Sequence, residues 1–79
     1  MSNLDKYKKA FLTSLSIDDT VFNEKLKYND IPEWDSIGHM SLISELEDEF
    51  NITIETDDIV DFSSYKKGIS ILKNYKIII

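Results

Sequence analysis

Apolar residues recur at a spacing of three to four along two long segments of this chain, and that period restricts its fold more than any other feature. A stripe with this spacing lies on one face of an α-helix and has to be buried against another element. In residues 3–15, where Ser2 or Asn3 can cap the first turn, the stripe consists of Leu4, Tyr7, Phe11 and Leu15. In residues 36–50 it consists of Leu42, Ile43, Leu46 and Phe50. The sequence therefore predicts two long amphipathic helices.

The segments around these helices are irregular or short. Residues 16–35 contain the only proline of the chain and mix polar turn residues with scattered apolar ones, so we expect a long loop that packs on the helices. Residues 51–54 predict an extended linker whose isoleucines reach the core, because the sequence offers them no partner strand. Thr56 is placed to cap a short third helix that ends near residue 62.

A last helix is predicted near the C-terminal end. Ser63 or Ser64 is placed to cap it, and its stripe consists of Tyr65, Ile69 and Leu72, with Tyr75 or Lys76 as its last member. Residues 77–79 are three isoleucines, which we expect either to end this helix against the first one or to form a loose tail. The expected fold is an all-α four-helix bundle with a short third helix and a long loop between helices one and two.

The chain contains no cysteine, so its stability has to come from packing. Its 79 residues suffice for one hydrophobic core, and we expect a single domain over residues 1–79. No stretch approaches the length of a membrane span or the continuous apolar run of a signal peptide, so a cytoplasmic location is the default expectation. No catalytic constellation is recognisable, and we do not expect an enzyme.

Negative charge is concentrated in the middle of the chain, which has a net charge of −6. No Lys or Arg lies between Lys27 and Lys66. Such a field repels nucleic acids and anionic membranes and attracts basic protein surfaces. The alternative is a solvated acidic surface that maintains solubility. The acidic residues of this stretch are Asp30, Glu33, Asp35, Glu45, Glu47, Asp48, Glu49, Glu55, Asp57, Asp58 and Asp61.

The second long helix is preceded by an Asp-Ser step, Asp35-Ser36. Either side chain can accept a hydrogen bond from the first N–H groups of the helix, which contributes roughly 1 kcal/mol. A helix cap explains this step completely when the dipeptide is considered alone.

The surrounding segment carries more information than the dipeptide. From Asp35 to Phe50 the chain reads DSIGHMSLISELEDEF, which resembles the modification motif and second helix of the acyl carrier protein family. In that family an Asp-Ser-(Leu/Ile) step opens the second helix. Leucines, an acidic run and a phenylalanine then follow at the spacing seen here in Leu42, Leu46, Glu47 to Glu49 and Phe50. Chain length, helix order and the long first loop agree as well, so the resemblance covers essentially the whole chain.

The resemblance implies that the hydroxyl of Ser36 receives 4′-phosphopantetheine from coenzyme A. A separate phosphopantetheinyl transferase, the holo-carrier synthase, would catalyse this reaction. The arm ends in a thiol, so a protein without cysteine can carry acyl or aminoacyl groups as thioesters. Further implied partners are an acyl-loading ligase or synthase and acyltransferases with basic docking patches. We expect the carrier to be a monomer with no bound metal.

Further site residues follow from the same resemblance. Asp35 is expected to cap the helix, with recognition by the transferase as a second role. Ile37 and Met40 are expected to contact partner enzymes, with burial in the core as the alternative. Acidic residues that pair with basic patches are expected at Glu45, Glu47 and Asp48.

The segment also departs from carriers of general fatty acid synthesis, which have acidic residues in the first two turns after the serine. Here Gly38, His39, Ser41 and Ser44 precede the acidic run, a pattern more similar to carriers of specialised pathways. Glycine in a helix costs up to about 1 kcal/mol relative to alanine. Gly38 therefore marks either a close approach near the arm or neutral drift.

Two aromatic residues near the serine have structural interpretations. His39, the only histidine, has no second metal ligand or nucleophile at helical spacing, so we expect a partly buried helical residue. Trp34 is expected to anchor the loop on the bundle, with a place near the acyl chain as the alternative. A rival to the carrier hypothesis is a carrier-like helical interaction module in which Ser36 stays an unmodified cap.

Overall fold

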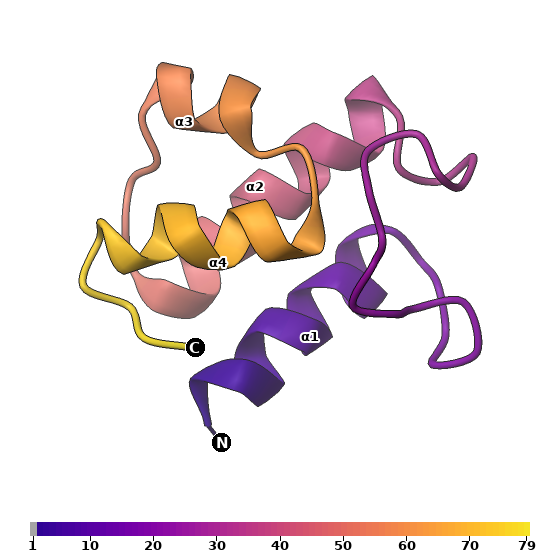
Figure 1. Cartoon of the computed structure of the whole chain (residues 1–79), viewed down its shortest axis with the longest axis horizontal. Helices are drawn as coiled ribbons and strands as arrows, with labels where there is room; N and C mark the ends of the chain where they lie inside the picture. Colours follow the sequence, from indigo (N-terminus) through magenta and orange to yellow (C-terminus); the bar gives the residue numbers. More distant parts are fainter. Residues whose placement is uncertain (1) are drawn as a thin grey trace.

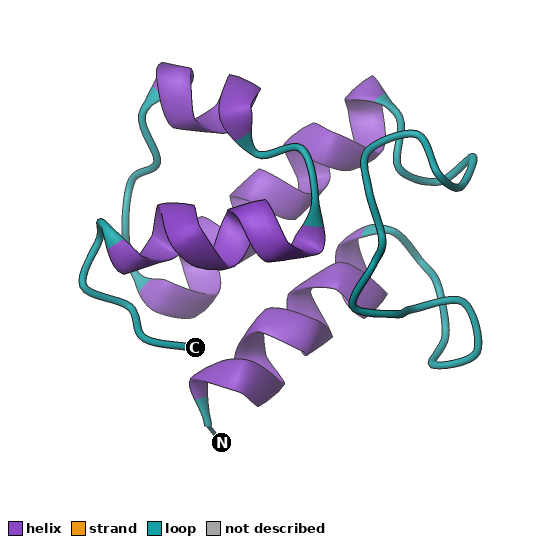
Figure 2. Ribbon diagram, in the orientation of Figure 1, coloured by secondary structure: helices purple, strands orange, loops and turns teal. Residues whose placement is uncertain are grey.

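The computed structural model describes residues 2–79 and, over that range, contains four helices and no strand. Figure 1 shows how the helices are arranged, and Figure 2 shows the long loop that joins the first two. The expected all-α bundle with a short third helix and a long first loop is confirmed. The helices are α1 (Asn3–Ser14), α2 (Ser36–Phe50), α3 (Thr56–Asp61) and α4 (Tyr65–Lys73).

Side-chain caps begin three of the four helices. Ser2 and Ser64 cap α1 and α4, because each hydroxyl accepts a hydrogen bond from the N–H three residues further on. Asp35 caps α2 in the same way. The prediction for α3 is wrong: Thr56 is its first helical residue, and the preceding Glu55 makes no side-chain cap.

Aromatic side chains from four segments form the centre of the core. Phe11 of α1 makes edge-to-face contacts with Trp34 of the loop and with Tyr7, at ring-centroid distances of 5.3 and 5.1 Å. Phe62, which follows α3, and Tyr65 of α4 complete the group. Such pairs stabilise a core beyond the area they bury. Trp34 is fully buried, which confirms that it anchors the loop on the bundle.

The predicted stripes are mostly buried, but Leu4 is exposed, and Phe50 and Ile69 are only partly buried. Leu42, Ile43 and Leu46 of α2 lie in the core, as expected. Leu4 is 48% exposed because it lies in the first turn of α1, beyond the buried end of the stripe, so its assignment to the core was wrong. Ala10, which the predicted stripe of α1 did not include, is buried in the core of the bundle.

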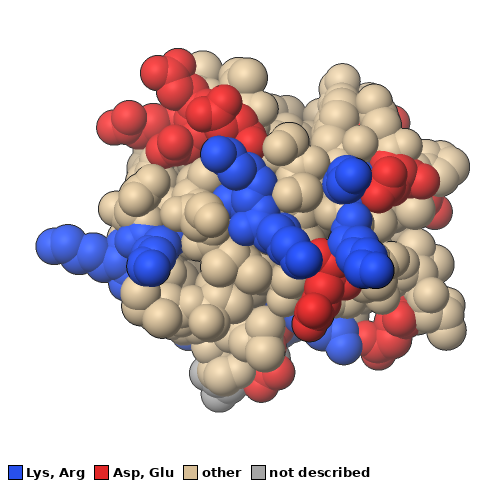
Figure 3. Space-filling model, viewed as in Figure 1, with Lys and Arg blue, Asp and Glu red and all other residues tan. Residues whose placement is uncertain are grey.

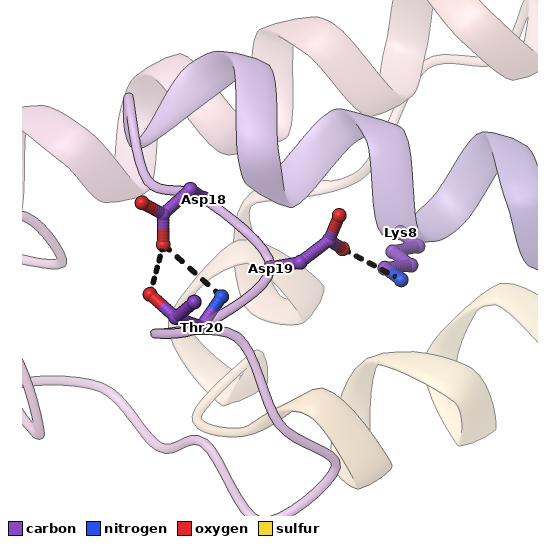
Figure 4. A network of polar contacts seen from close by, with 4 residues as sticks. All are labelled: Lys8, Asp18, Asp19 and Thr20. Atoms are coloured by element: carbon purple, nitrogen blue, oxygen red, sulfur yellow. Dashed lines mark hydrogen bonds and ion pairs between the residues drawn. The ribbon is translucent and has the colours of Figure 1, made fainter.

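The long loop is attached to the bundle at both of its ends. Near α1, the Lys8 ammonium forms an ion pair of 2.7 Å with Asp19, while the Asp18 carboxylate accepts hydrogen bonds from Thr20 (Figure 4). These hydrogen bonds hold the pKa of Asp18 below its usual range. Further along, an isolated antiparallel bridge joins Lys27 to Ser64, at the start of α4.

The linker and the chain ends are packed as well. Ile54 is buried, and its N–H donates to the Glu47 carboxylate at 2.8 Å. After α4 the chain makes a turn at residues 74–76 and residues 77–79 are not helical, yet Ile77 is buried and the Ile78 carbonyl accepts a hydrogen bond from Asn3 at 3.0 Å. The C-terminal isoleucines therefore form neither the end of a helix nor a loose tail, and the two chain ends lie side by side (Figure 1).

The buried Tyr7 phenol gives the fold a testable sensitivity to alkali. Its hydroxyl donates to the Tyr65 carbonyl at 2.6 Å, and burial, followed by the neighbouring Tyr65 side chain, raises the pKa of Tyr7. In the unfolded chain a tyrosine ionises near pH 10, so above that pH the folded state keeps a proton that the unfolded state loses. The free energy of unfolding should then fall by up to about 1.4 kcal/mol per pH unit.

Urea unfolding above and below about pH 10 measures this slope. The variant Tyr7→Phe is expected to be less stable at neutral pH, where it lacks the hydrogen bond to Tyr65, but to have a flatter alkaline slope. Parallel slopes for the two proteins would contradict the prediction.

Candidate functional site

Ser36 is the first residue of α2, and its side chain is exposed. The Asp35 carboxylate accepts a hydrogen bond from the Gly38 N–H at 2.8 Å, which confirms Asp35 as the helix cap. Within residues 2–79 the N–H groups of Ser36 and Ile37 donate no hydrogen bond. The hydroxyl of Ser36 therefore lies at the positive end of the helix dipole, where an anionic group is stabilised.

Gly38 allows the loop to pass directly against the first turn of α2. A Cβ atom at this position would collide with the Glu33 carbonyl oxygen and would lie 3.1 Å from the Leu15 side chain. Gly38 therefore marks a close approach, and the group that approaches the helix is the loop backbone at Glu33. This contact fixes the segment that carries Asp35 and Ser36.

Tyr28 of the loop reaches the serine. Its hydroxyl oxygen lies 3.1 Å from Ser36 Oγ, and either group can donate the hydrogen bond. The Tyr28 ring packs edge-to-face against His39 and Trp34, at centroid distances of 5.5 and 6.3 Å. The loop therefore supplies a polar contact to Ser36 from a ring that is held on two sides.

His39 is partly buried, as expected, and connects three segments. Its Nδ1 accepts a hydrogen bond from the Trp34 indole at 3.0 Å, and its Nε2 donates to the Ile59 carbonyl of α3 at 2.8 Å. Since Nδ1 has to accept and Nε2 has to donate, these contacts assign the neutral tautomer protonated on Nε2. His39 joins the loop, α2 and α3 beneath Ser36.

A hollow of about 280 Å³ opens beside Ser36, between α2 and α3. Its surface is mainly apolar, with hydroxyl groups at Tyr28, Ser36 and Ser63. Because α3 contributes no buried side chain of its own, polar contacts help to hold this wall in place. The hollow is lined by Tyr28, Ser36, His39, Met40, Ile59, Val60, Phe62 and Ser63.

The far end of α3 is tethered by the residue Tyr75. Its hydroxyl donates to the Asp58 carboxylate at 2.6 Å and accepts from the Glu55 N–H at 2.9 Å. Partial burial, followed by the hydrogen bond to Asp58, raises the pKa of Tyr75. Together with the His39–Ile59 contact, this fixes α3 at two points across the hollow.

Three exposed apolar side chains surround the serine. Ile37 is 79% exposed, Met40 54% and Val60 76%. Ile37 and Met40 are therefore not core residues, so that alternative was wrong, and Val60 adds an apolar contribution from α3. An exposed apolar cluster of this kind is typical of an interaction surface.

The predicted acidic positions lie away from Ser36. Glu45 is nine residues further along α2, which is about 14 Å at the rise of an α-helix. Glu47 is partly buried and engaged with Ile54, whereas Asp48 is exposed. Figure 3 shows acidic side chains gathered over α3 and basic side chains across α4, whereas elsewhere on this face acidic and basic side chains lie next to one another.

Comparisons with protein-family models, with curated proteins and with solved structures found no match. Over residues 2–79, no helix is long and apolar enough to cross a membrane. Nor does that part of the chain bring three His, Cys, Asp or Glu residues together as a group suited to hold a metal ion.

Sequence reasoning placed Asp35, Ser36, Ile37 and Met40 correctly at the start of α2 but missed the residues that complete the site. Tyr28 lies eight positions before Ser36 in an irregular loop, and Val60 lies in a helix too short to show a periodic stripe. The turn residues that surround Tyr28 were the available signal, because they bring the loop back toward the bundle.

Proposed function

We propose that this protein is an acyl carrier protein that holds acyl or aminoacyl groups on a 4′-phosphopantetheine arm attached to Ser36. The observation that supports this most strongly is an exposed serine hydroxyl at the N-terminus of α2, beside an apolar hollow and an exposed apolar cluster. The residues present fit the arm: unpaired N–H groups at Ser36 and Ile37 favour its phosphate, and the Ser36 side chain is exposed. When attached, the arm supplies a terminal thiol on which an acyl group is carried as a thioester.

The attachment reaction is a phosphoryl transfer from coenzyme A. The Oγ–P bond to Ser36 forms as the pyrophosphate P–O bond breaks, and adenosine 3′,5′-bisphosphate leaves. The serine proton passes to a base of the transferase. The chain's own contribution is to present Ser36 at a fixed helix end, which Asp35 caps and the Gly38 contact holds.

Partner recognition is assigned to the surface around Ser36. Asp35 is proposed to contribute to recognition by the phosphopantetheinyl transferase. Ile37 and Met40, both exposed, would contact the acyl-loading ligase or synthase and the acyltransferases. Glu45, Glu47 and Asp48 would pair with basic patches on these enzymes. One carboxylate oxygen of Glu47 already accepts a hydrogen bond from the Ile54 N–H.

The late start of the acidic run favours service in a specialised biosynthetic pathway over general fatty acid synthesis. The proposed carrier is monomeric and cytoplasmic. The acidic side chains gathered over α3 support partners that approach this side with a basic surface.

The test is a mass measurement on the purified chain after incubation with coenzyme A, Mg²⁺ and a broad-specificity phosphopantetheinyl transferase. We expect the mass to increase by one phosphopantetheinyl group, Ser36→Ala to abolish the increase, and Ser41→Ala, which removes another exposed hydroxyl of α2, to retain it. An unchanged mass, or an increase that persists in Ser36→Ala, would overturn the carrier proposal. An unchanged mass would leave the unmodified interaction module as the better explanation.

A further inference from the structure

We propose that Tyr28 positions Ser36 for modification and then donates a hydrogen bond to the phosphodiester formed there; this inference rests on the carrier function proposed above. The contact that carries it is the 3.1 Å separation between the two hydroxyl oxygens. It joins residues eight positions apart, across the end of the long loop. Ser36 is otherwise exposed, so its hydroxyl has one protein partner within residues 2–79.

The position of the Tyr28 hydroxyl is fixed by the packing around its ring. His39 and Trp34 contact the ring edge-to-face, and those two residues are hydrogen-bonded to each other. The Tyr28 N–H donates to the Ser63 carbonyl at 3.0 Å, which holds the backbone against the start of α4. A hydroxyl on a ring held in this way loses little conformational freedom when it forms a hydrogen bond.

An exposed serine side chain can occupy three staggered rotamers. The contact with Tyr28 favours the rotamer that places Oγ at the mouth of the hollow. In the transfer reaction Oγ forms its bond to phosphorus, the bisphosphate leaves, and the serine proton goes to the transferase. Tyr28 is thus a positioning residue, which limits the orientations from which Oγ can react.

Modification also fixes the direction of the hydrogen bond. In the unmodified protein either hydroxyl can donate. Once Oγ is esterified it has no proton, so the Tyr28 hydroxyl becomes the donor and the phosphodiester the acceptor. A hydrogen bond to an anionic oxygen is stronger than one between neutral groups. The same residue therefore holds the serine before the reaction and its phosphate afterwards.

The experiment compares wild type with Tyr28→Phe, which keeps the ring and removes the hydroxyl. Initial rates of modification are measured at several carrier concentrations, after circular dichroism has shown that both proteins are folded. We expect kcat to fall by about three- to tenfold while KM for the carrier stays unchanged. The matched control is Tyr65→Phe, which removes a hydroxyl that lines no part of the hollow.

A second measurement does not depend on rates. After prolonged incubation both proteins are modified completely, and we expect the ³¹P resonance of the phosphodiester to differ between wild type and Tyr28→Phe but not between wild type and Tyr65→Phe. Equal rates and equal ³¹P shifts would overturn the role of Tyr28 and leave the carrier function intact. If wild type itself acquires no mass, both proposals fail together.

Discussion

Gly68→Ala is expected to destabilise the fold by about 2 to 4 kcal/mol, although alanine is the better helix former. Gly68 is buried in α4, and a Cβ atom there would overlap the Tyr7 hydroxyl and the Phe62 ring. The ring belongs to the aromatic core, and displacing the hydroxyl breaks its hydrogen bond to the Tyr65 carbonyl. An unsatisfied buried phenol costs about 1 to 3 kcal/mol, which exceeds the gain in helix propensity.

Urea unfolding measures the change in the free energy of unfolding, with Ser70→Ala as the control because Ser70 is an exposed position of the same helix. A double variant tests the cause. Phe62→Leu alone should be destabilising because it leaves a cavity, but combined with Gly68→Ala it should cost less than the sum of the single changes. Additive effects, or a Gly68→Ala protein as stable as wild type, would contradict the prediction, because they would show that the neighbouring side chains move aside without cost.

The two glycines illustrate what the sequence could not reveal. Helix propensity alone treats Gly38 and Gly68 as weak points of α2 and α4. In the structure each is the position where another segment passes closest: the loop backbone at Gly38 and two aromatic side chains at Gly68. Local propensity contains no term for such contacts, because they depend on residues distant in the sequence.

The elements themselves were predictable because their stripes are long and their caps are common ones. Asp35 could be assigned from the sequence, and the cap of α4 could be narrowed to Ser63 or Ser64, since a cap acts within four residues. Thr56 could not be distinguished from Glu55 by the same reasoning, because α3 begins without a side-chain cap. Short helices depend on tertiary contacts, which here include the His39–Ile59 hydrogen bond.

The site was predictable only along α2. Asp35, Ser36 and Ile37 are adjacent in the sequence, so predicting the start of α2 also predicted the position of all three residues. Tyr28 reaches Ser36 because the loop returns to the bundle at the bridge between Lys27 and Ser64, and loop paths are not encoded by a periodic pattern. The contact between Tyr28 and Ser36 could therefore be found only from the fold.

Positive and negative charges are distributed unevenly among the helices. Six of the nine lysines lie on α1 and α4, whereas α3 and the second half of α2 contain seven of the fifteen acidic residues and no lysine. A partner steered by this field would meet the acidic elements and the exposed apolar cluster of Ile37, Met40 and Val60 from the same side. Steering and apolar contact would thus act together near Ser36.

Gly38→Ala is expected to affect both the fold and the site. The added Cβ meets the Glu33 carbonyl oxygen, which is backbone and cannot rotate away as a side chain can. Relief requires a shift of the segment that contains Trp34, which is fully buried, and Asp35, which caps the helix. We expect a loss of about 2 to 4 kcal/mol in the free energy of unfolding, despite a propensity gain of up to about 1 kcal/mol.

Thermal or urea unfolding of Gly38→Ala, with Ser44→Ala as a control at an exposed position of α2, measures this loss. The modification assay then reports on the site at a temperature where the variant remains folded, and its rate should be lower because Ser36 moves with the displaced segment. If Gly38→Ala were instead more stable by about 1 kcal/mol, as at an exposed helix position, the loop would be free to move away from α2. The contact between Gly38 and Glu33 would then have no part in fixing Ser36, and the serine would depend on its cap and on Tyr28 alone.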